Sequence, residues 1–273
     1  MTLEEQAKRA LDGDAEALET LVRAIRDDIY NLALRMLWHP EDAREATQEI
    51  LVKVLTHLDS FQGRSAFKTW VYRIASNFLL NTRKRRAEHE EATFELFARS
   101  LSQGSADASG ISEPERAVLV EEVKVGCTHA MLLCLDRDHR LAYLLGELFG
   151  LPGDEAAAVL EVEPATFRKR LSRARERLGN FVEGNCGLAN PASSCRCSRR
   201  IKQATADGHL DPAHLLFAHH PRAAELVGPP KAEMESLARA AELFRANPRY
   251  AAPETLGREL RALLESRKLR ILQ

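Results

Sequence analysis

Residues 61–86 read FQGRSAFKTWVYRIASNFLLNTRKRR, and this stretch gives the strongest prediction about the fold. Apolar side chains recur in it every three or four positions, which predicts a helix with one buried face. That face consists of Phe67, Val71, Ile74, Ala75, Phe78 and Leu79. The spacing leaves the other faces to cations, amides and two aromatic rings, namely Lys68, Trp70, Tyr72, Arg73, Asn77 and Asn81.

This mixture of side chains suits a surface that binds unpaired nucleic acid. Cations neutralise phosphates, and an aromatic ring that stacks on a base contributes about 1–3 kcal/mol. The alternative is an amphipathic helix in which Trp70 and Tyr72 only seal a core. The segment by itself supports both interpretations equally.

The composition predicts a soluble globular protein. The chain has 273 residues, of which 45% are hydrophobic and 29% charged, enough to bury the cores of two or three domains. No run approaches the roughly 18 apolar residues of a membrane span, and the first residues lack the apolar run of a secretory signal. We therefore expect a cytoplasmic protein that does not contact a membrane.

Charge and cysteine content narrow the partners further. The formal net charge is -1, but cations concentrate at 83–86 and 168–177, and acids at 41–49 and 88–95. The net charge therefore does not exclude a nucleic-acid partner, because the basic clusters could bind one locally. Five cysteines, an odd number in a chain without an export signal, do not predict a disulfide framework.

Helical spacing also covers the residues before this stretch. Apolar residues repeat from 18 to 37, and Pro40 is well suited to begin a second helix because proline is tolerated at the first helical position. The second helix has a polar stripe on its outer side, which by itself is typical of a solvated surface. The stripe consists of Asp42, Glu45, Gln48 and Glu49.

Beyond the basic run, residues 87–100 are compatible with a short helix, and the Ser, Gly, Ala and Pro content of 101–115 predicts a flexible stretch and a domain boundary. We assign 87–112 as the linker. Helical spacing resumes over 117–134 and 137–149. Cys127 and Cys134 lie on an apolar face of the first of these helices, and we interpret them as small buried hydrophobic residues.

Residues 151–178 predict a helix, a short turn and a second helix. Phe167, Leu171 and Ala174 face inward on the second helix, which leaves its many cations for a partner. Arg and Lys neutralise DNA phosphates, and Arg pairs with guanine through two hydrogen bonds. The pattern therefore favours a helix that reads the major groove, with a solvated basic helix as the alternative.

Residues 10–86 and 113–180 resemble the bacterial sigma-70 family, and within it the extracytoplasmic-function group, which retains regions two and four. Region two is matched by Glu41-Asp42 through Gln48-Glu49-Ile50-Leu51, and by Phe61, Gly63, Ser65, Phe67, Thr69-Trp70-Val71-Tyr72, Ile74-Ala75 and Asn77. Region four is matched by Leu135-Asp136-Arg137, Gly150-Leu151, Thr166, Arg170-Leu171 and Arg173-Ala174. The chain departs from the family with Glu163-Pro164-Ala165 in place of Ser-Glu-Gly and Phe167 in place of Val.

The resemblance implies an all-α transcription initiation factor with no catalytic residues and no required cofactor. It implies region two over 1–86, a linker over 87–112, region four over 113–182 and an additional module over 183–273. Its partners would be core RNA polymerase, promoter DNA and, where one exists, an anti-sigma protein. The sequence does not indicate whether one exists.

The resemblance also implies a role for each group of residues. The stripe Asp42, Glu45, Gln48 and Glu49 would dock on polymerase. The residues expected to bind unpaired bases of the minus-ten element are Arg64, Phe67, Lys68, Trp70, Tyr72, Arg73, Asn77 and Asn81. Those expected to bind the minus-thirty-five duplex are Thr166, Arg168, Lys169, Arg170, Arg173 and Arg175.

A second function class is a free-standing helix-turn-helix regulator that binds duplex DNA without polymerase. The match around Trp70 and Tyr72 favours the initiation factor, because we expect a simple repressor to have no use for those rings on an exposed face. An enzyme is disfavoured, because the C-terminal module shows no grouping of nucleophile, base and orienting residue.

The additional module is expected to be regulatory and mainly helical, with helices near 231–246 and 254–267. Cys186, Cys195, Cys197 and His209 could bind zinc or copper, since thiolates and imidazole suit both ions. Neighbouring arginines could instead lower the thiol pKa values and give a redox switch. A purely structural or DNA-contacting loop is the third alternative.

Overall fold

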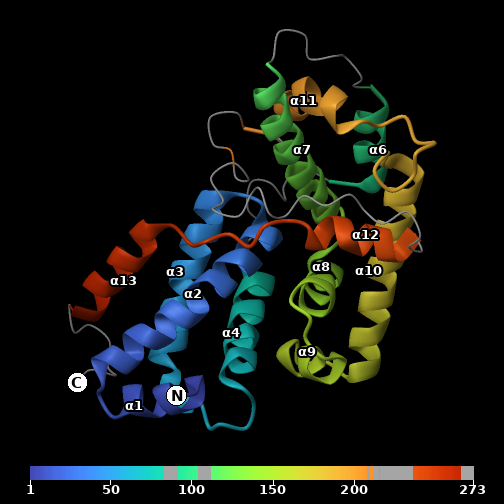
Figure 1. The fold of residues 1–273 in the computed structure, drawn as a ribbon. Helices are drawn as coiled ribbons and strands as arrows, with labels where there is room; N and C mark the ends of the chain where they lie inside the picture. The colour runs from blue at the N-terminus through green and yellow to red at the C-terminus, as the bar shows by residue number, and fades with distance from the viewer. Residues whose placement is uncertain (83–91, 104–111, 208–209, 212–214, 216–235, 266–273) are drawn as a thin grey trace. The chain divides into compact units, whose positions relative to one another are not determined.

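The computed structural model describes residues 1–82, 92–103, 112–207, 210–211, 215 and 236–265, and the regular elements in these ranges are helices (Figure 1). The predicted all-α fold is confirmed. Contacts divide the chain into two compact units. The first comprises 1–89, 151–168 and 249–273, and the second comprises 90–150 and 169–248.

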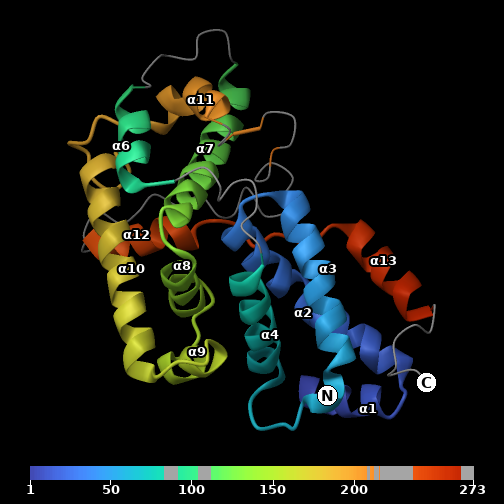
Figure 2. The same ribbon diagram turned by 180° about the vertical axis from the view of Figure 1, so that it is seen from behind.

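A bundle of helices near the N-terminus forms most of the first unit. Its central helix α2 packs against α1, α3 and α4 (Figures 1 and 2). The bounds are α1 Leu3–Leu11, α2 Ala15–Leu37, α3 Pro40–Thr56, the short 3₁₀ turn η1 Leu58–Ser60 and α4 Phe67–Asn81.

Local sequence sets the starts of these helices. The Thr2 and Asp14 side chains accept hydrogen bonds from backbone N–H groups at the starts of α1 and α2, which otherwise lack partners. At the start of α3 the His39 side chain accepts a hydrogen bond from the Asp42 N–H in the same way. Pro40 occupies the first turn, as predicted. The helices then bury their apolar faces, and Ile29, like many core residues, is fully inaccessible.

Helix α9 Gly153–Val159 also belongs to the first unit, where it packs against α4. A short turn joins it to α10 Pro164–Asn185. In this turn Val162 N–H donates to the Ala157 carbonyl at 3.1 Å, and Glu161 takes a left-handed conformation with φ of 53°. The predicted order of helix, turn and helix is therefore present.

The second unit is built around α7 and most of α10. It contains α6 Phe94–Gln103, α7 Glu113–Leu133, α8 Arg137–Tyr143, the π-helical turn η2 Leu144–Leu148, α11 Cys197–Ala206 and α12 Ser236–Arg245. Helix α6 lies in the segment assigned as the linker and overlaps the short helix considered over 87–100. It is ordered because Phe94 and Phe97 pack on Phe181 of α10, with ring centroids 5.1 and 5.5 Å apart.

Residues 249–265 belong to the first unit. We call residues 249–259 the C-terminal strap. The strap ends within helix α13, Glu254–Glu265. Asn31 of α2 donates to the Tyr250 carbonyl and accepts from the Tyr250 N–H at 2.8 Å, and α13 lies beside α3 (Figures 1 and 2). The strap thus continues the bundle rather than forming part of a separate module.

No helix in the described parts of the chain is long and apolar enough to cross a membrane.

Candidate nucleic-acid interface

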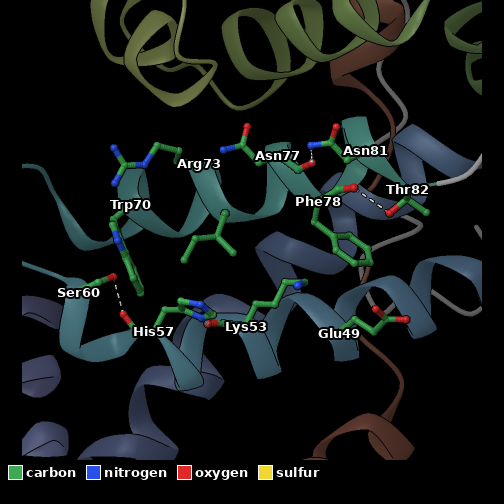
Figure 3. A pocket seen from close by; sticks show the side chains of 11 residues that line it. Glu49, Lys53, His57, Ser60, Trp70, Arg73, Asn77, Phe78, Asn81 and Thr82 are labelled. Carbon is green, nitrogen blue, oxygen red and sulfur yellow. Dashed lines mark hydrogen bonds between the residues drawn. The ribbon is translucent and has the colours of Figure 1, made fainter.

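A groove of about 650 Å³ opens between α3 and α4 in the first unit (Figure 3). It is lined by Glu49, Lys53, His57, Ser60, Trp70, Arg73, Ile74, Asn77, Phe78, Asn81 and Thr82. The α4 wall follows from helical spacing, because Arg73, Asn77 and Asn81 are each about one turn apart. In Figure 3 Trp70 and Phe78 point from α4 toward α3, and the guanidinium and the two amides form one row along the outer rim of the groove.

The α3 wall adds groups that sequence analysis did not assign to nucleic acid. Glu49, Lys53 and His57 follow one another every four residues, and this spacing is the signal that could have found them. The Lys53 ammonium lies 6.0 Å from the centroid of the Phe78 ring, and the His57 ring nitrogen lies 2.9 Å from the Lys53 carbonyl. The groove therefore combines cations with an aromatic ring.

The expected exposure of two aromatic side chains was wrong. Trp70 is 5% exposed and Tyr72 is 7% exposed. Trp70 packs against Phe61 and Phe67, with ring centroids 5.5 and 5.7 Å away, and burial of Tyr72 raises the pKa of its hydroxyl, with the Asp28 charge adding to the effect. The reason is that α4 contacts α1, α2 and α3 on one side and α9 on another, so more than one face is covered.

The other residues expected at the minus-ten element fall into separate surroundings. Phe67 is fully buried, and its N–H donates to the Glu4 carboxylate at 2.9 Å. Arg64 is exposed in the loop before α4. The Lys68 ammonium is paired with Asp28 at 2.7 Å and does not line the groove. The groove thus includes Trp70, Arg73, Asn77 and Asn81 of the expected set.

The polar stripe of α3 lies where sequence analysis placed it. Glu45 and Glu49 are exposed and Asp42 and Gln48 are half-buried. Glu49 also lines the groove, so the stripe and the groove meet at this residue.

The cations of α10 divide into two sets. Arg168, Lys169 and Arg173 are exposed, as is Thr166. Arg170, by contrast, is half-buried and pairs with Asp138 of α8 at 3.2 Å.

Arg175 also contacts acidic protein groups. Its Nε donates to the Glu147 carboxylate at 2.6 Å, and this buried carboxylate accepts a second hydrogen bond from Arg245 at 2.6 Å. Arg175 is itself exposed, so it differs from Arg168, Lys169 and Arg173 in its acidic partner and not in its accessibility. Whether the six α10 residues bind DNA stays a prediction. Acids on α8 and η2, distant in sequence, bind Arg170 and Arg175 in the folded chain.

The cysteines of the expected metal set are half-buried free thiols. Among the residues that the structure describes, no three Cys, His, Asp or Glu side chains are arranged as ligands of one ion. His209, the fourth expected ligand, lies outside the described residues.

Comparison with known proteins identifies the families to which two segments of the chain belong. Residues 21–89 match sigma-70 region 2, and residues 126–178 match sigma-70 region 4. RNA polymerase sigma-H factor of Pseudomonas aeruginosa is 33% identical over 179 residues, which cover 64% of this chain and 91% of that protein. ECF RNA polymerase sigma-E factor of Escherichia coli strain K12 is 34% identical over 180 residues, covering 64% and 92%. A solved structure, CnrH in complex with the cytosolic domain of CnrY, shares 23% identity at a TM-score of 0.45 and covers 65% of this chain and 95% of that one.

A helical bundle with a polar groove and a helix-turn-helix with a cationic second helix define a DNA-binding transcription protein. The chain belongs to the sigma-70 family, in its extracytoplasmic-function group. It is an initiation factor that binds core RNA polymerase and directs it to specific promoters, and it is not an enzyme.

Proposed function

We propose that each step of promoter recognition is carried by a distinct surface of this chain. The groove between α3 and α4 binds an unpaired base of the minus-ten element, the exposed face of α10 binds the minus-thirty-five duplex, and the polar stripe of α3 docks on polymerase. The observation that carries this proposal is the row of Arg73, Asn77 and Asn81 along an open groove next to that stripe.

The groove supplies what an unpaired nucleotide requires. The amides of Asn77 and Asn81 both donate and accept hydrogen bonds, so they can pair with the edges of a base. Arg73 and Lys53 can neutralise phosphate, and the Phe78 ring together with the uncovered edge of Trp70 gives apolar contact. Flipping a base out of the stack costs a few kcal/mol, which these contacts offset.

Buried aromatic residues then have a supporting role. Phe61, Phe67 and Trp70 pack together and position the start of α4, so the groove is preformed before DNA arrives. Phe67 and Tyr72 therefore act through α4, and the groove residues touch the base.

On α10 the exposed residues Thr166, Arg168, Lys169 and Arg173 are the proposed DNA contacts. Thr166, Lys169 and Arg173 recur at helical spacing and so share one face. Arg170 and Arg175 instead stabilise the fold of region four through Asp138 and Glu147. This division reduces the expected duplex contacts to four residues.

The stripe on α3 is proposed to dock on polymerase, and we infer that the protein acts in the cytoplasm, where polymerase is. An acidic surface of this kind suits a basic partner surface. In two similar solved structures, CnrH is bound to the cytosolic domain of CnrY, and the sigma factor RpoE from Bartonella quintana is bound to the anti-sigma factor NepR. An anti-sigma protein is also proposed as a partner of this chain.

Reconstituted transcription tests these assignments. The wild-type chain with core polymerase should give a run-off transcript from a cognate promoter, and Glu45→Arg with Glu49→Arg should abolish assembly. A matched control reverses an exposed acid outside the stripe, Glu183→Arg. Assembly of the stripe variant at wild-type affinity would contradict the docking role.

The free-standing regulator predicts a different result. It would bind promoter duplex tightly without polymerase and would give no transcript when polymerase is added. The family assignment favours the initiation factor.

A further inference from the structure

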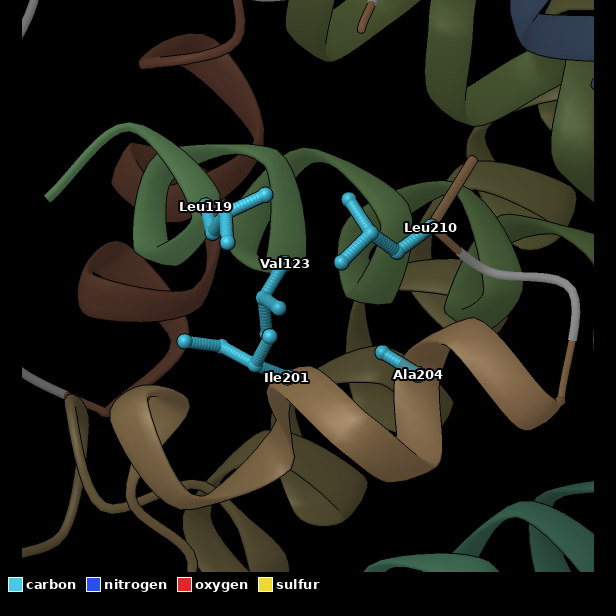
Figure 4. Packing of buried hydrophobic residues seen from close by; sticks show 5 residues of the cluster. All are labelled: Leu119, Val123, Ile201, Ala204 and Leu210. Atoms are coloured by element: carbon cyan, nitrogen blue, oxygen red, sulfur yellow. The ribbon is translucent and has the colours of Figure 1, made fainter. Parts of the chain in front are cut away.

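Four of the five cysteines gather in the second unit, where α11 packs on α7. Cys127 of α7 and Cys197 of α11 both pack against one apolar cluster, whose buried members are drawn in Figure 4. The buried members of that cluster are Leu119, Val123, Ile201, Ala204 and Leu210.

Helical spacing explains why both thiols face this contact. Cys127 follows Val123 by four residues, and Cys197 precedes Ile201 by four, so each cysteine shares a face with a cluster residue. Figure 4 shows the side chains of Val123 and Ile201 next to each other. The two cysteines are therefore brought together by the packing of α7 on α11.

The loop between α10 and α11 brings the other two thiols to the same place. Cys186 directly follows α10, and the next residue, Gly187, lies so close to Cys195 that an added Cβ would sit 2.1 Å from the Cys195 carbonyl oxygen. Arg196 fixes the loop by donating to the Ser193 carbonyl at 2.5 Å.

The other three cysteines all act electrostatically on Cys127. Burial raises the pKa of the Cys127 thiol, and the charges of Cys197, Cys195 and Cys186 raise it further. Burial also raises the pKa of Cys197 to about 12, again with contributions from Cys186 and Cys195.

We propose that Cys127, Cys186, Cys195 and Cys197 form a four-thiolate site for a thiophilic divalent cation, and that zinc is the ion it binds. Zinc in structural sites takes four ligands and accepts four cysteine sulfurs. On binding, each thiol gives one proton to solvent and its sulfur donates a lone pair to zinc, which leaves a net charge of about -2 on the site. The neighbouring cations Arg200, Arg196 and Lys124 offset that charge.

The site differs from the sequence-based ligand set by one residue. Cys127 replaces His209, and Cys127 lies within the region 4 match of 126–178. The other three ligands follow that match, so the ion would join region four to the additional module. Because no three side chains yet surround a common point in the described residues, the thiols must turn about their side-chain bonds to close on the ion.

Zinc content of the full-length chain tests the site. The reduced chain should bind one zinc ion, and cobalt in its place should give the absorption bands of tetrahedral thiolate coordination. Cys127→Ser should weaken zinc binding about tenfold or more and lose part of the cobalt–thiolate absorption. Cys134→Ser is the matched control, because Cys134 is also near the end of α7 but contacts the Ala130 carbonyl instead.

A second readout separates a lost ligand from a lost fold. Zinc should raise the melting temperature of the wild type and of Cys134→Ser, and should raise that of Cys127→Ser much less. Helix content without metal should be equal in all three. The proposal is overturned if the reduced chain binds no zinc, or if His209→Ala loses zinc while Cys127→Ser keeps it.

The C-terminal strap supports a second, independent inference. Its residues Tyr250 and Leu256 are 6% and 0% exposed, the Ala252 N–H donates to Asp27 at 3.1 Å, and Arg249 pairs with Asp28 at 3.1 Å. Further along, Glu259 pairs with Arg44 of α3 at 3.2 Å.

Arg44 lies in the chain between Asp42 and Glu45 of the polar stripe, and Gln48 follows it by one helical turn. We infer that the strap competes with polymerase for α3 and lowers the affinity of the free factor. This inference rests on the proposed docking role of α3. The competitor for α3 is thus the C-terminal strap of the same chain.

Affinity for core polymerase tests the competition in the full-length chain. Glu259→Arg should release α13 from α3 by repulsion with Arg44 and tighten binding several-fold. Glu254→Arg is the matched control, since Glu254 is exposed at the start of the same helix. Asn31→Ala, which removes the reciprocal bonds to Tyr250, should also tighten binding.

The result distinguishes the two proposals. If the Glu45→Arg, Glu49→Arg variant loses polymerase while the strap variants bind as the wild type does, the competition is overturned and the docking role stands. If the stripe variant binds normally, the docking role fails and the competition fails with it.

Discussion

Helices α4 and α10 both combine apolar residues with residue types that bind nucleic acid. They differ in which of those side chains the fold buries. On α4 the two aromatic rings expected at the surface are buried, and the polar row of Arg73, Asn77 and Asn81 forms the groove wall. On α10 the exposed residues are largely those expected, and acids bind Arg170 and Arg175. Cations and amides thus predict a surface better than aromatic residues do, because an aromatic ring gains more from burial.

The largest expected effect is on the buried side of α4. Phe67→Ala should lower the free energy of unfolding by about 3–5 kcal/mol, because it removes a fully buried ring and leaves a cavity. Chemical denaturation measures this loss. Phe78→Ala is the matched control, since Phe78 is half-buried beside the groove and should cost clearly less.

The next effect separates the two sets of cations on α10. Arg173→Ala should weaken binding of the minus-thirty-five duplex by the holoenzyme and reduce the salt slope by about one, with little change in stability. Arg175→Ala should instead lower stability, because the buried Glu147 carboxylate loses one of its two arginine partners. If both variants lost DNA affinity equally and neither lost stability, Arg173 and Arg175 would have the same role, which contradicts this account.

The smallest effect concerns the start of α8, which binds α10 through its acids. The Asp136 side chain accepts from the His139 N–H at 3.0 Å, so Asp136→Ala should lower the free energy of unfolding by about 1 kcal/mol. Partial burial alone would raise the pKa of Asp136, but the hydrogen bonds and charge of His139, with the Arg177 charge, lower it overall.

The sign of the pH dependence follows from that lowered pKa. The contribution of Asp136 to stability is complete above the carboxyl pKa of the unfolded chain, about 3.9, and is lost as the pH falls through the lower folded value. The difference between wild type and Asp136→Ala in urea unfolding should therefore be constant near neutral pH and shrink below about pH 4. A difference that grows on acidification would contradict the assignment.

Much of the fold could be predicted from the sequence. Starts marked by Pro40 and Pro164 were placed correctly, because a proline at the first turn is a local signal. The order of helix, turn and helix over 151–178 was also predicted. Helix α11 was missed, because its apolar face, with Ile201 and Ala204, is short and follows a loop rich in Ser and Cys.

What the sequence could not give depends on contacts between distant segments. The burial of Trp70 and Tyr72 depends on how many helices surround α4, and the pairing of Arg175 depends on Glu147, 28 residues away. Contacts between distant segments also bring Cys127 and Cys197 to one cluster and place Tyr250 against Asn31. Spacing within one helix shows which residues share a face, and another segment decides what covers that face.

The most direct test of the central claim is promoter opening measured at the minus-ten element. A fluorescent base analogue in the non-template strand reports unstacking when holoenzyme is added. We expect the wild type and Glu16→Ala, an exposed residue of α2 outside the groove, to give the full signal, and Arg73→Ala with Asn77→Ala to lose most of it while polymerase binding and stability stay unchanged. Full opening by that double variant would show that the groove between α3 and α4 does not bind the flipped base.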